Sequence, residues 1–284
     1  MDKQRVCKSN ALIEASYRLT IGEQRLILSC IAQVRPQEPL TDEHMYRVTV
    51  QDIAQLTESG TTTTVYRDVK EAAGRFFERR VMIYGEPNGK GKRPVLVTRW
   101  VQTVAYIEDA GRVELRFSKD IIPYLTQLTE QFTQYALSDV AKMTSSYAIR
   151  LYELLVQWRG EGKREVALEW LRNALQLAGK YSSIKDFKKW VIAPAVAQIN
   201  AHSPLNVSVT QRKAGRVVTH LVFAFTEKAP APDKPTPAPV IYGVPMSLIE
   251  SDARPGETYS QAAARLAKSV ADRETINQSI ARKP

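Results

Sequence analysis

The spacing of apolar residues predicts alternating helices and strands in the first part of the chain. Residues 20–34 carry apolar side chains at helical spacing, and Thr20 and Glu23 stand at the spacing of a capping box at the start of this helix. Pro36 and Pro39 end it. The elements predicted next are a strand at 46–50, a helix at 51–56, a longer helix at 64–80, and strands at 81–84, 95–107 and 113–117.

The middle of the chain repeats this order of elements. The pattern predicts a helix at 144–158, a strand at 166–168, helices at 169–177 and 183–202, and strands at 207–210 and 217–225. Both stretches therefore run helix, strand, short helix, turn, long helix and β hairpin, which is the order of a winged helix. We expect an α+β fold of two tandem winged-helix domains. The repetition is one of element order and not of residue identity.

The remaining segments set the expected domain boundaries. Residues 119–137 carry a helical stripe of apolar residues and predict a connecting helix packed across the two domains. Residues 229–239 hold five prolines, so we expect extended chain there, followed by a short helix at 257–273. We expect this Pro-rich tail to be wholly or partly disordered, or to fold against a partner. The expected parts are residues 1–118, 119–137, 138–228 and 229–284.

The net charge of +10 is concentrated in one of these parts. It divides into +2 for residues 1–137, +7 for 138–228 and +1 for 229–284. Such a local excess indicates a polyanionic partner, either nucleic acid or an anionic membrane. Membrane is the weaker alternative, because no strongly amphipathic surface helix with exposed aromatics backs the lysines. Only Cys7 and Cys30 are present, and the N-terminus has no long apolar segment, so we expect a cytoplasmic location.

The second long helix of the basic part is the strongest candidate site. Ser183 is the expected N-cap, with Asp186 at the capping-box position, and Pro194 should kink the helix or mark a restart, most simply as a packing bend. The N-terminal part of such a helix enters the major groove, where lysine donates to guanine. The alternative is that these lysines form a solvated face. The predicted DNA-binding residues of this helix are Ser182, Ser183, Lys185, Lys188 and Lys189.

The hairpin after this helix supplies a second candidate set. Arg212, Lys213 and Arg216 surround the Gly215 turn, where a wing would meet the DNA backbone or minor groove, although turns favour lysine and glycine in any case. The first domain offers a weaker set. Its members lie on the helix at 64–80 and in the turn-rich loop at 85–94, which we read as the first wing; they are Arg67, Lys70, Lys90, Lys92 and Arg93. Acidic residues alternate with the basic ones on that helix, so several should form ion pairs three or four residues apart.

Enzymatic alternatives find little support in the sequence. The three histidines are isolated and lack metal-ligand spacing, which counts against a nickase that uses a histidine pair beside a tyrosine. The loop at 85–92 misses the spacing of a phosphate-binding loop and lies between strands. We therefore predict no catalytic residue, no metal and no cofactor.

Two segments resemble a known family. Residues 11–28 (ALIEASYRLTIGEQRLIL) resemble the opening helices of iteron-binding plasmid replication initiator (Rep) proteins, and residues 181–196 (YSSIKDFKKWVIAPAV) resemble their second-domain recognition helix, including the proline. The resemblance covers residues 5 to 228. It implies that the second winged helix reads half of a repeated origin site, and that the first contacts the DNA backbone in the monomer and forms the dimer interface in an autorepressing form. It also implies recruitment of host DnaA and the replicative helicase.

The sequence thus supports one leading hypothesis and two alternatives. The leading hypothesis is a non-enzymatic replication initiator that binds double-stranded DNA at repeats. A winged-helix transcriptional regulator would use the same DNA chemistry without opening an origin. A DNA nicking enzyme is the alternative from a different class.

Overall fold

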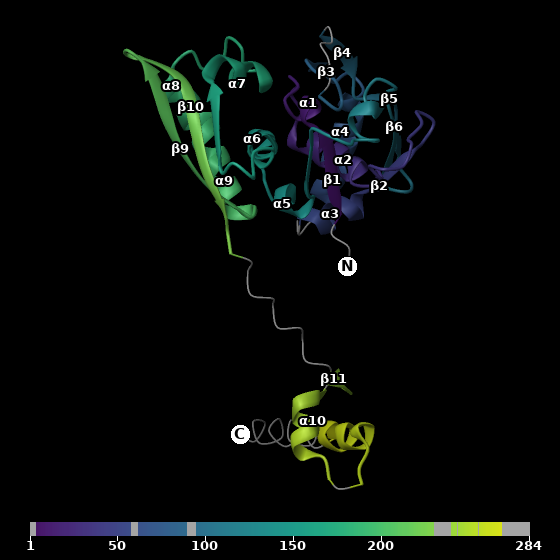
Figure 1. The fold of residues 1–284 in the computed structure, drawn as a ribbon. Coiled ribbons are helices and arrows are strands. Elements are labelled where there is room, and N and C mark those ends of the chain that lie inside the picture. The colour runs from purple at the N-terminus through teal and green to yellow at the C-terminus, as the bar shows by residue number, and fades with distance from the viewer. Residues whose placement is uncertain are drawn as a thin grey trace, which may run out of the picture. The chain divides into compact units, whose positions relative to one another are not determined.

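The chain folds into two compact units, residues 1–228 and residues 229–284, which are treated separately (Figure 1). The computed structural model describes residues 4–57, 62–89, 95–229, 240–242, 244–254 and 256–268. The larger unit contains both expected winged helices, and the following paragraphs take its elements in chain order.

The first winged helix is built on a three-stranded antiparallel sheet. Its elements are α2 (Ile21–Ile31), β2 (Tyr46–Thr49), α3 (Val50–Thr57), α4 (Thr62–Phe76), β5 (Val101–Ile107) and β6 (Arg112–Phe117). The strands lie in the order β2-β6-β5. The predicted capping box of α2 is confirmed, because Thr20 Oγ1 accepts from the Glu23 amide at 3.3 Å and Glu23 Oε2 accepts from the Thr20 amide at 2.8 Å.

A separate hairpin is inserted between α4 and β5. It consists of β3 (Arg80–Ile83) and β4 (Leu96–Arg99), which pair only with each other among the described strands. The single strand predicted at 95–107 is therefore wrong: the chain turns at Trp100, which is fully buried, and β5 joins a different sheet. The loop between β3 and β4 is consequently not the wing of the first domain. By sheet order, that wing is β5–β6.

The second winged helix repeats the sheet order of the first. Its elements are α6 (Ser146–Val156), β8 (Lys163–Ala167), α7 (Leu168–Ala174), α8 (Ile184–Phe187), a π-helical turn (Lys188–Ile192), α9 (Ala193–His202), β9 (Leu205–Ala214) and β10 (Val217–Glu227). The strands lie in the order β8-β10-β9, so in each half the first strand pairs with the last. Figure 1 shows the long β9–β10 hairpin alongside α8 and α9.

The connecting helix expected over 119–137 is wrong. The segment forms a 3-10 turn (Ile122–Tyr124) and then β7 (Phe132–Ala136), which pairs antiparallel with β1 (Arg5–Ser9). The short helices α1 (Asn10–Ile13) and α5 (Ser138–Ala141) follow β1 and β7. The predicted apolar stripe is buried except at its end: Phe132 is 43% exposed on the strand. The backbone partner of β7 comes from the other end of the domain, which a local helical pattern does not reveal.

A buried ionic cluster joins the two halves. Lys8 on β1 donates to Glu153 on α6, with Lys8 Nζ and Glu153 Oε1 2.6 Å apart, and both side chains are at most 2% exposed. Arg150 pairs with the same carboxylate at 3.1 Å, and the hydroxyls of Tyr17 and Tyr135 donate to it at 3.2 and 2.6 Å. The cluster therefore holds the N-terminal strand against a helix of the second winged helix.

The smaller unit has its own small core. Its described elements are β11 (Val240–Ile241), β12 (Val244–Pro245), α10 (Met246–Asp252) and helical residues 259–268. Val244, Ile249, Ala262 and Ala263 are buried together. The helix predicted at 257–273 is confirmed for residues 259–268. It begins two residues later than predicted, and residues 269–273 lie outside the described residues. Residues 230–239 of the Pro-rich stretch also lie outside them.

Candidate nucleic-acid interface

The turn before the second long helix is held by one arginine. Gly179, with φ +73°, supplies the left-handed conformation that this turn requires. Arg172 on α7 donates to the carbonyl oxygens of Tyr181 and Ser182 at 2.8 and 3.3 Å, and its guanidinium lies 5.4 Å from the Phe187 ring centroid. Arg172 therefore connects α7 to the turn before α8, a role that sequence reasoning missed.

The helix begins where the sequence predicts, but its capping box does not form. Ser183 occupies the N-cap position with extended backbone, and its carbonyl accepts from the Phe187 amide at 3.0 Å. Its hydroxyl makes no cap hydrogen bond, so the predicted Ser183–Asp186 box is wrong. Side-chain length does not account for this, because Thr49 and Asp52, at the same spacing, exchange both capping-box hydrogen bonds, at 3.0 and 2.8 Å.

Pro194 marks the restart that the sequence predicts. The backbone passes from α8 through the π-helical turn and resumes as α9, with Pro194 in the first turn of α9. Within the π turn the Ala193 amide donates to the Lys188 carbonyl, five residues back. Pro194 has no N–H to donate, so the hydrogen-bond ladder of the helix is interrupted at this position.

The helix turns its apolar side to the core and its lysines outward. Phe187 and Val191 are almost fully buried, whereas Lys185 and Lys189 are exposed, as are Ser182 and Ser183. Lys188 is partly buried, and its Nζ donates to Gln211 Oε1 on β9 at 3.2 Å. The structure thus brings the helix and the hairpin into one surface, and this hydrogen bond connects them.

The predicted wing residues do not share one face. Side chains alternate along a strand, so Lys213 lies on the face of Gln211, which is paired in register with the buried Leu221. Arg212 lies on the opposite face. There its Nε is 2.6 Å from Glu165 Oε1 on β8, and its guanidinium is within 3.0 Å of the His220 ring nitrogens.

Arg216 follows Gly215 in the hairpin turn, where Gly215 has φ +61°, and its side chain is exposed. The interface on the helix side therefore comprises Lys185, Lys188, Lys189 and Lys213, with Arg216 at the tip and Arg212 behind the sheet. Gln211 could be found from strand alternation alone. Glu165 and His220 require the three-strand register, which the sequence pattern does not give.

The predicted DNA-binding residues of the first domain that the structure describes form ion pairs with acidic side chains. Lys70 on α4 pairs with Glu108 in the β5–β6 turn and lies 5.8 Å from the Tyr106 ring centroid. Arg67 is 3.7 Å from Asp68. Arg75 pairs with Glu71 at 3.2 Å, which confirms the expected four-residue spacing for this pair, whereas Lys70 and Arg67 pair at other separations. Lys90, Lys92 and Arg93 lie outside the described residues.

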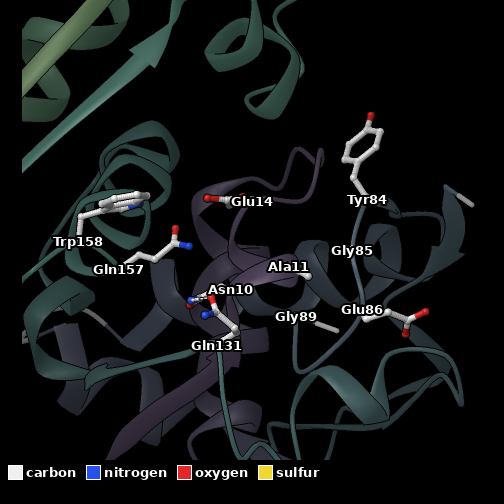
Figure 2. A pocket seen from close by; sticks show the side chains of 10 residues that line it. All are labelled: Asn10, Ala11, Glu14, Tyr84, Gly85, Glu86, Gly89, Gln131, Gln157 and Trp158. Carbon is white, nitrogen blue, oxygen red and sulfur yellow. Dashed lines mark hydrogen bonds between the residues drawn. The ribbon is translucent and has the colours of Figure 1, made fainter. Parts of the chain in front are cut away.

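A pocket of about 340 Å³ lies between the two halves (Figure 2). Figure 2 shows Trp158 and Gln157 on one side of it, Tyr84 and Gly85 on the other, and Glu14 between them. None of the predicted site residues is among the described residues that line it, and its titratable side chains there are Glu14, Tyr84 and Glu86.

The two cysteines are free thiols, and both are buried. Burial raises the pKa of the Cys7 thiol to about 11 and that of Cys30 further still, so both are protonated at neutral pH. In the described residues no group of three or more His, Cys, Asp or Glu side chains is arranged to hold a metal ion. Nor does any helix in the described ranges have the length and apolar character needed to cross a membrane.

The fold defines a tandem winged-helix protein, and the basic residues predicted on the helix and the hairpin lie on its second winged helix. The family model described as "Initiator Replication protein, WH1" matches residues 5–156, and that described as "Initiator Rep protein, WH2" matches residues 167–225. The chain belongs to this family of replication initiators, which confirms the resemblance read from the sequence.

Individual relatives agree with this assignment. A replication initiation protein from Escherichia coli is 29% identical over 77% of this chain and 68% of its own length. The PI protein of Escherichia coli is 22% identical over 78% of this chain and 83% of its own. A crystal structure of Pi initiator protein in complex with iteron DNA has the same fold, with a TM-score of 0.68 at 22% identity, covering 80% of this chain and 99% of that one.

Proposed function

We propose that this protein binds direct repeats at a plasmid replication origin and helps to open it, without enzymatic activity of its own, in the cytoplasm. The proposal is carried by the basic residues of the reading helix (residues 184–202) and of the β9–β10 wing. The Lys188–Gln211 hydrogen bond connects these two elements, and the chain is a member of the initiator family. Lysines at the start of such a helix are suited to guanine and phosphate. The Pi protein, which has this fold, is bound to iteron DNA in its crystal structure.

Origin opening separates this function from that of a transcriptional regulator. The purified chain is footprinted on its own plasmid, and single-stranded thymines are then mapped with permanganate in supercoiled DNA. We expect protection of direct repeats of around twenty base pairs, about two helical turns, with opening in a neighbouring AT-rich stretch. Protection of an inverted operator alone, with no opening, would favour the regulator. Conversion of the supercoiled plasmid to an open circle with a covalent protein adduct would favour a nicking enzyme.

We further propose that a dimer forms through the first domain and represses the protein's own promoter, which would contribute to copy control. The β3–β4 hairpin supports this proposal. Val97 on β4 is 54% exposed, Val95 beside it is 50% exposed, and β4 has an open edge among the described strands. Host DnaA and the replicative helicase are the proposed partners of the DNA-bound monomer.

Sedimentation of the full chain tests the dimer. Val97→Lys places a charge on the exposed strand and should shift the equilibrium toward monomer at a given concentration. Val217→Lys is the matched control, because Val217 is 67% exposed on the second hairpin and should leave the equilibrium unchanged. Equal dimerisation of both variants and the wild type would place the interface elsewhere.

A further inference from the structure

Trp190 is the exposed aromatic side chain of the reading helix. It is 58% exposed, although indole is among the largest apolar groups a protein can bury. The Lys189 ammonium lies 4.5 Å from its ring centroid, a cation–π contact that holds a positive charge beside the ring. An exposed tryptophan within a basic surface marks a place where apolar area is covered on binding.

The position of Trp190 around the helix axis follows from its neighbours. Phe187 and Val191 point into the core, and Lys188 reaches the wing from one flank. With about 100° per residue in an α-helix, or the smaller step of a π turn, Lys189 lies opposite the core and Trp190 lies on the flank away from the wing. The π-helical turn that contains Trp190 is a local departure of the kind often found at functional sites.

The positive charges around Trp190 indicate what kind of partner covers its side of the helix. Lys185, Lys188 and Lys189 on the same helix complement a polyanion, so the surface that covers Trp190 is the wall and floor of a DNA major groove. The apolar group on base edges in that groove is the C5-methyl of thymine. We propose that Trp190 reads a thymine methyl, beside the base or phosphate contacted by Lys189. This inference rests on the proposed repeat binding and adds a specificity-determining residue to it.

Methyl deletion in the DNA provides the test. The preferred duplex is first selected from a random library with the wild-type chain, and each thymine in it is then replaced singly by deoxyuridine. We expect the wild type to lose about fourfold in affinity at one position, the value of one buried methyl group. Trp190→Ala should bind the thymine and uracil forms equally there, and Trp190→Phe should keep most of the difference.

A second tryptophan supplies the control. Trp158 is 42% exposed but lines the pocket between the halves, so Trp158→Phe should keep wild-type sensitivity at every thymine. Unchanged thermal unfolding of Trp190→Ala confirms that it folds, as its exposure predicts. A selected duplex on which no uracil substitution matters, or on which Trp190→Ala retains the sensitivity, overturns the inference alone. Failure of the wild type to select any sequence overturns the proposed function and this inference together.

Discussion

Lys188 and Gln211 join the reading helix to the wing, with Lys188 Nζ 3.2 Å from Gln211 Oε1. The neighbouring Lys189 is placed differently, over the ring of Trp190. Two adjacent lysines thus have separate tasks, one in holding the hairpin beside the helix and one at the outer surface. Both bring positive charge to the same side of the second winged helix.

Removal of Lys188 and Lys189 together should lower the affinity for DNA and make it depend less steeply on salt concentration. Lys188→Ala combined with Lys189→Ala is expected to lower affinity, and the slope of log K against log salt should fall by about one for each phosphate that the protein no longer neutralises. Fluorescence anisotropy with labelled repeat DNA at several salt concentrations measures both. If affinity and slope are unchanged, these lysines are only a solvated face.

Lys213 and Arg212 lie on opposite faces of the β9–β10 hairpin, so their alanine variants should differ in DNA affinity. Lys213→Ala should reduce affinity and lower the salt slope by about one, because Lys213 shares the face of Gln211. Arg212→Ala should have a smaller effect, because Arg212 lies behind the sheet and already pairs with Glu165. The same titrations compare them at equal net charge. A larger loss for Arg212→Ala would show that DNA approaches the other face.

Removing the acidic side chain of Glu108 from the first wing (β5–β6) should change the affinity for DNA. Glu108 pairs with Lys70, so Glu108→Gln releases this lysine and removes a negative charge from the wing turn. If the first domain meets the DNA backbone, affinity should rise and the salt slope should steepen by about one. Glu38→Gln, which breaks an exposed Arg35–Glu38 pair outside this wing, controls for the change in net charge. Equal behaviour of the two variants would count against a DNA contact at Lys70.

The buried cluster between the halves should tolerate loss of its lysine better than loss of its carboxylate. Glu153→Gln leaves Lys8 and Arg150 buried without an acid and should cost about 3–5 kcal/mol in the free energy of unfolding. Lys8→Met leaves Arg150 paired with Glu153 and should cost less. Urea unfolding of the two variants checks the order. The reverse order would mean that Arg150 does not compensate the carboxylate.

The same cluster predicts how stability changes with pH. Burial alone would raise the pKa of Glu153, but Lys8 and Arg150 lower it below the ordinary carboxyl value of 4.5. The unfolded chain therefore binds a proton first as the pH falls, and the stabilisation is lost through the acid range below the unfolded pKa. Wild-type stability should decrease there more steeply than that of Glu153→Gln. Parallel urea titrations across this range measure the difference.

The sequence predicted correctly several features that depend on residues close together in the chain. Thr20 and Glu23 form their capping box because both partners lie within one turn. Ser183 and Asp186 have the same spacing without the Ser183 cap hydrogen bond, because spacing alone does not fix the side-chain conformation. The order of helices and strands could also be read, since it depends on periodicity within each element.

Non-local pairing accounts for what the sequence did not show. Residues 132–136 form a strand because residues 5–9 pair with them, and the apolar pattern between 121 and 128 is satisfied by a buried turn. Likewise Lys8 has no nearby sequence feature that indicates Glu153, and Arg212 has none that indicates Glu165. Such contacts depend on the register of distant strands, so the faces of the wing became clear only from the structure.

The pairing of β1 with β7, and of Lys8 with Glu153, has a consequence for biosynthesis. The two charged residues are 145 positions apart, so at about 5–20 residues per second Lys8 leaves the ribosome on the order of ten seconds before its partner. The N-terminal strand must remain unpaired until β7 and α6 have been made. The first winged helix therefore completes its folding only as the second begins, and a nascent chain released before Glu153 would lack the acid that its N-terminal cation requires.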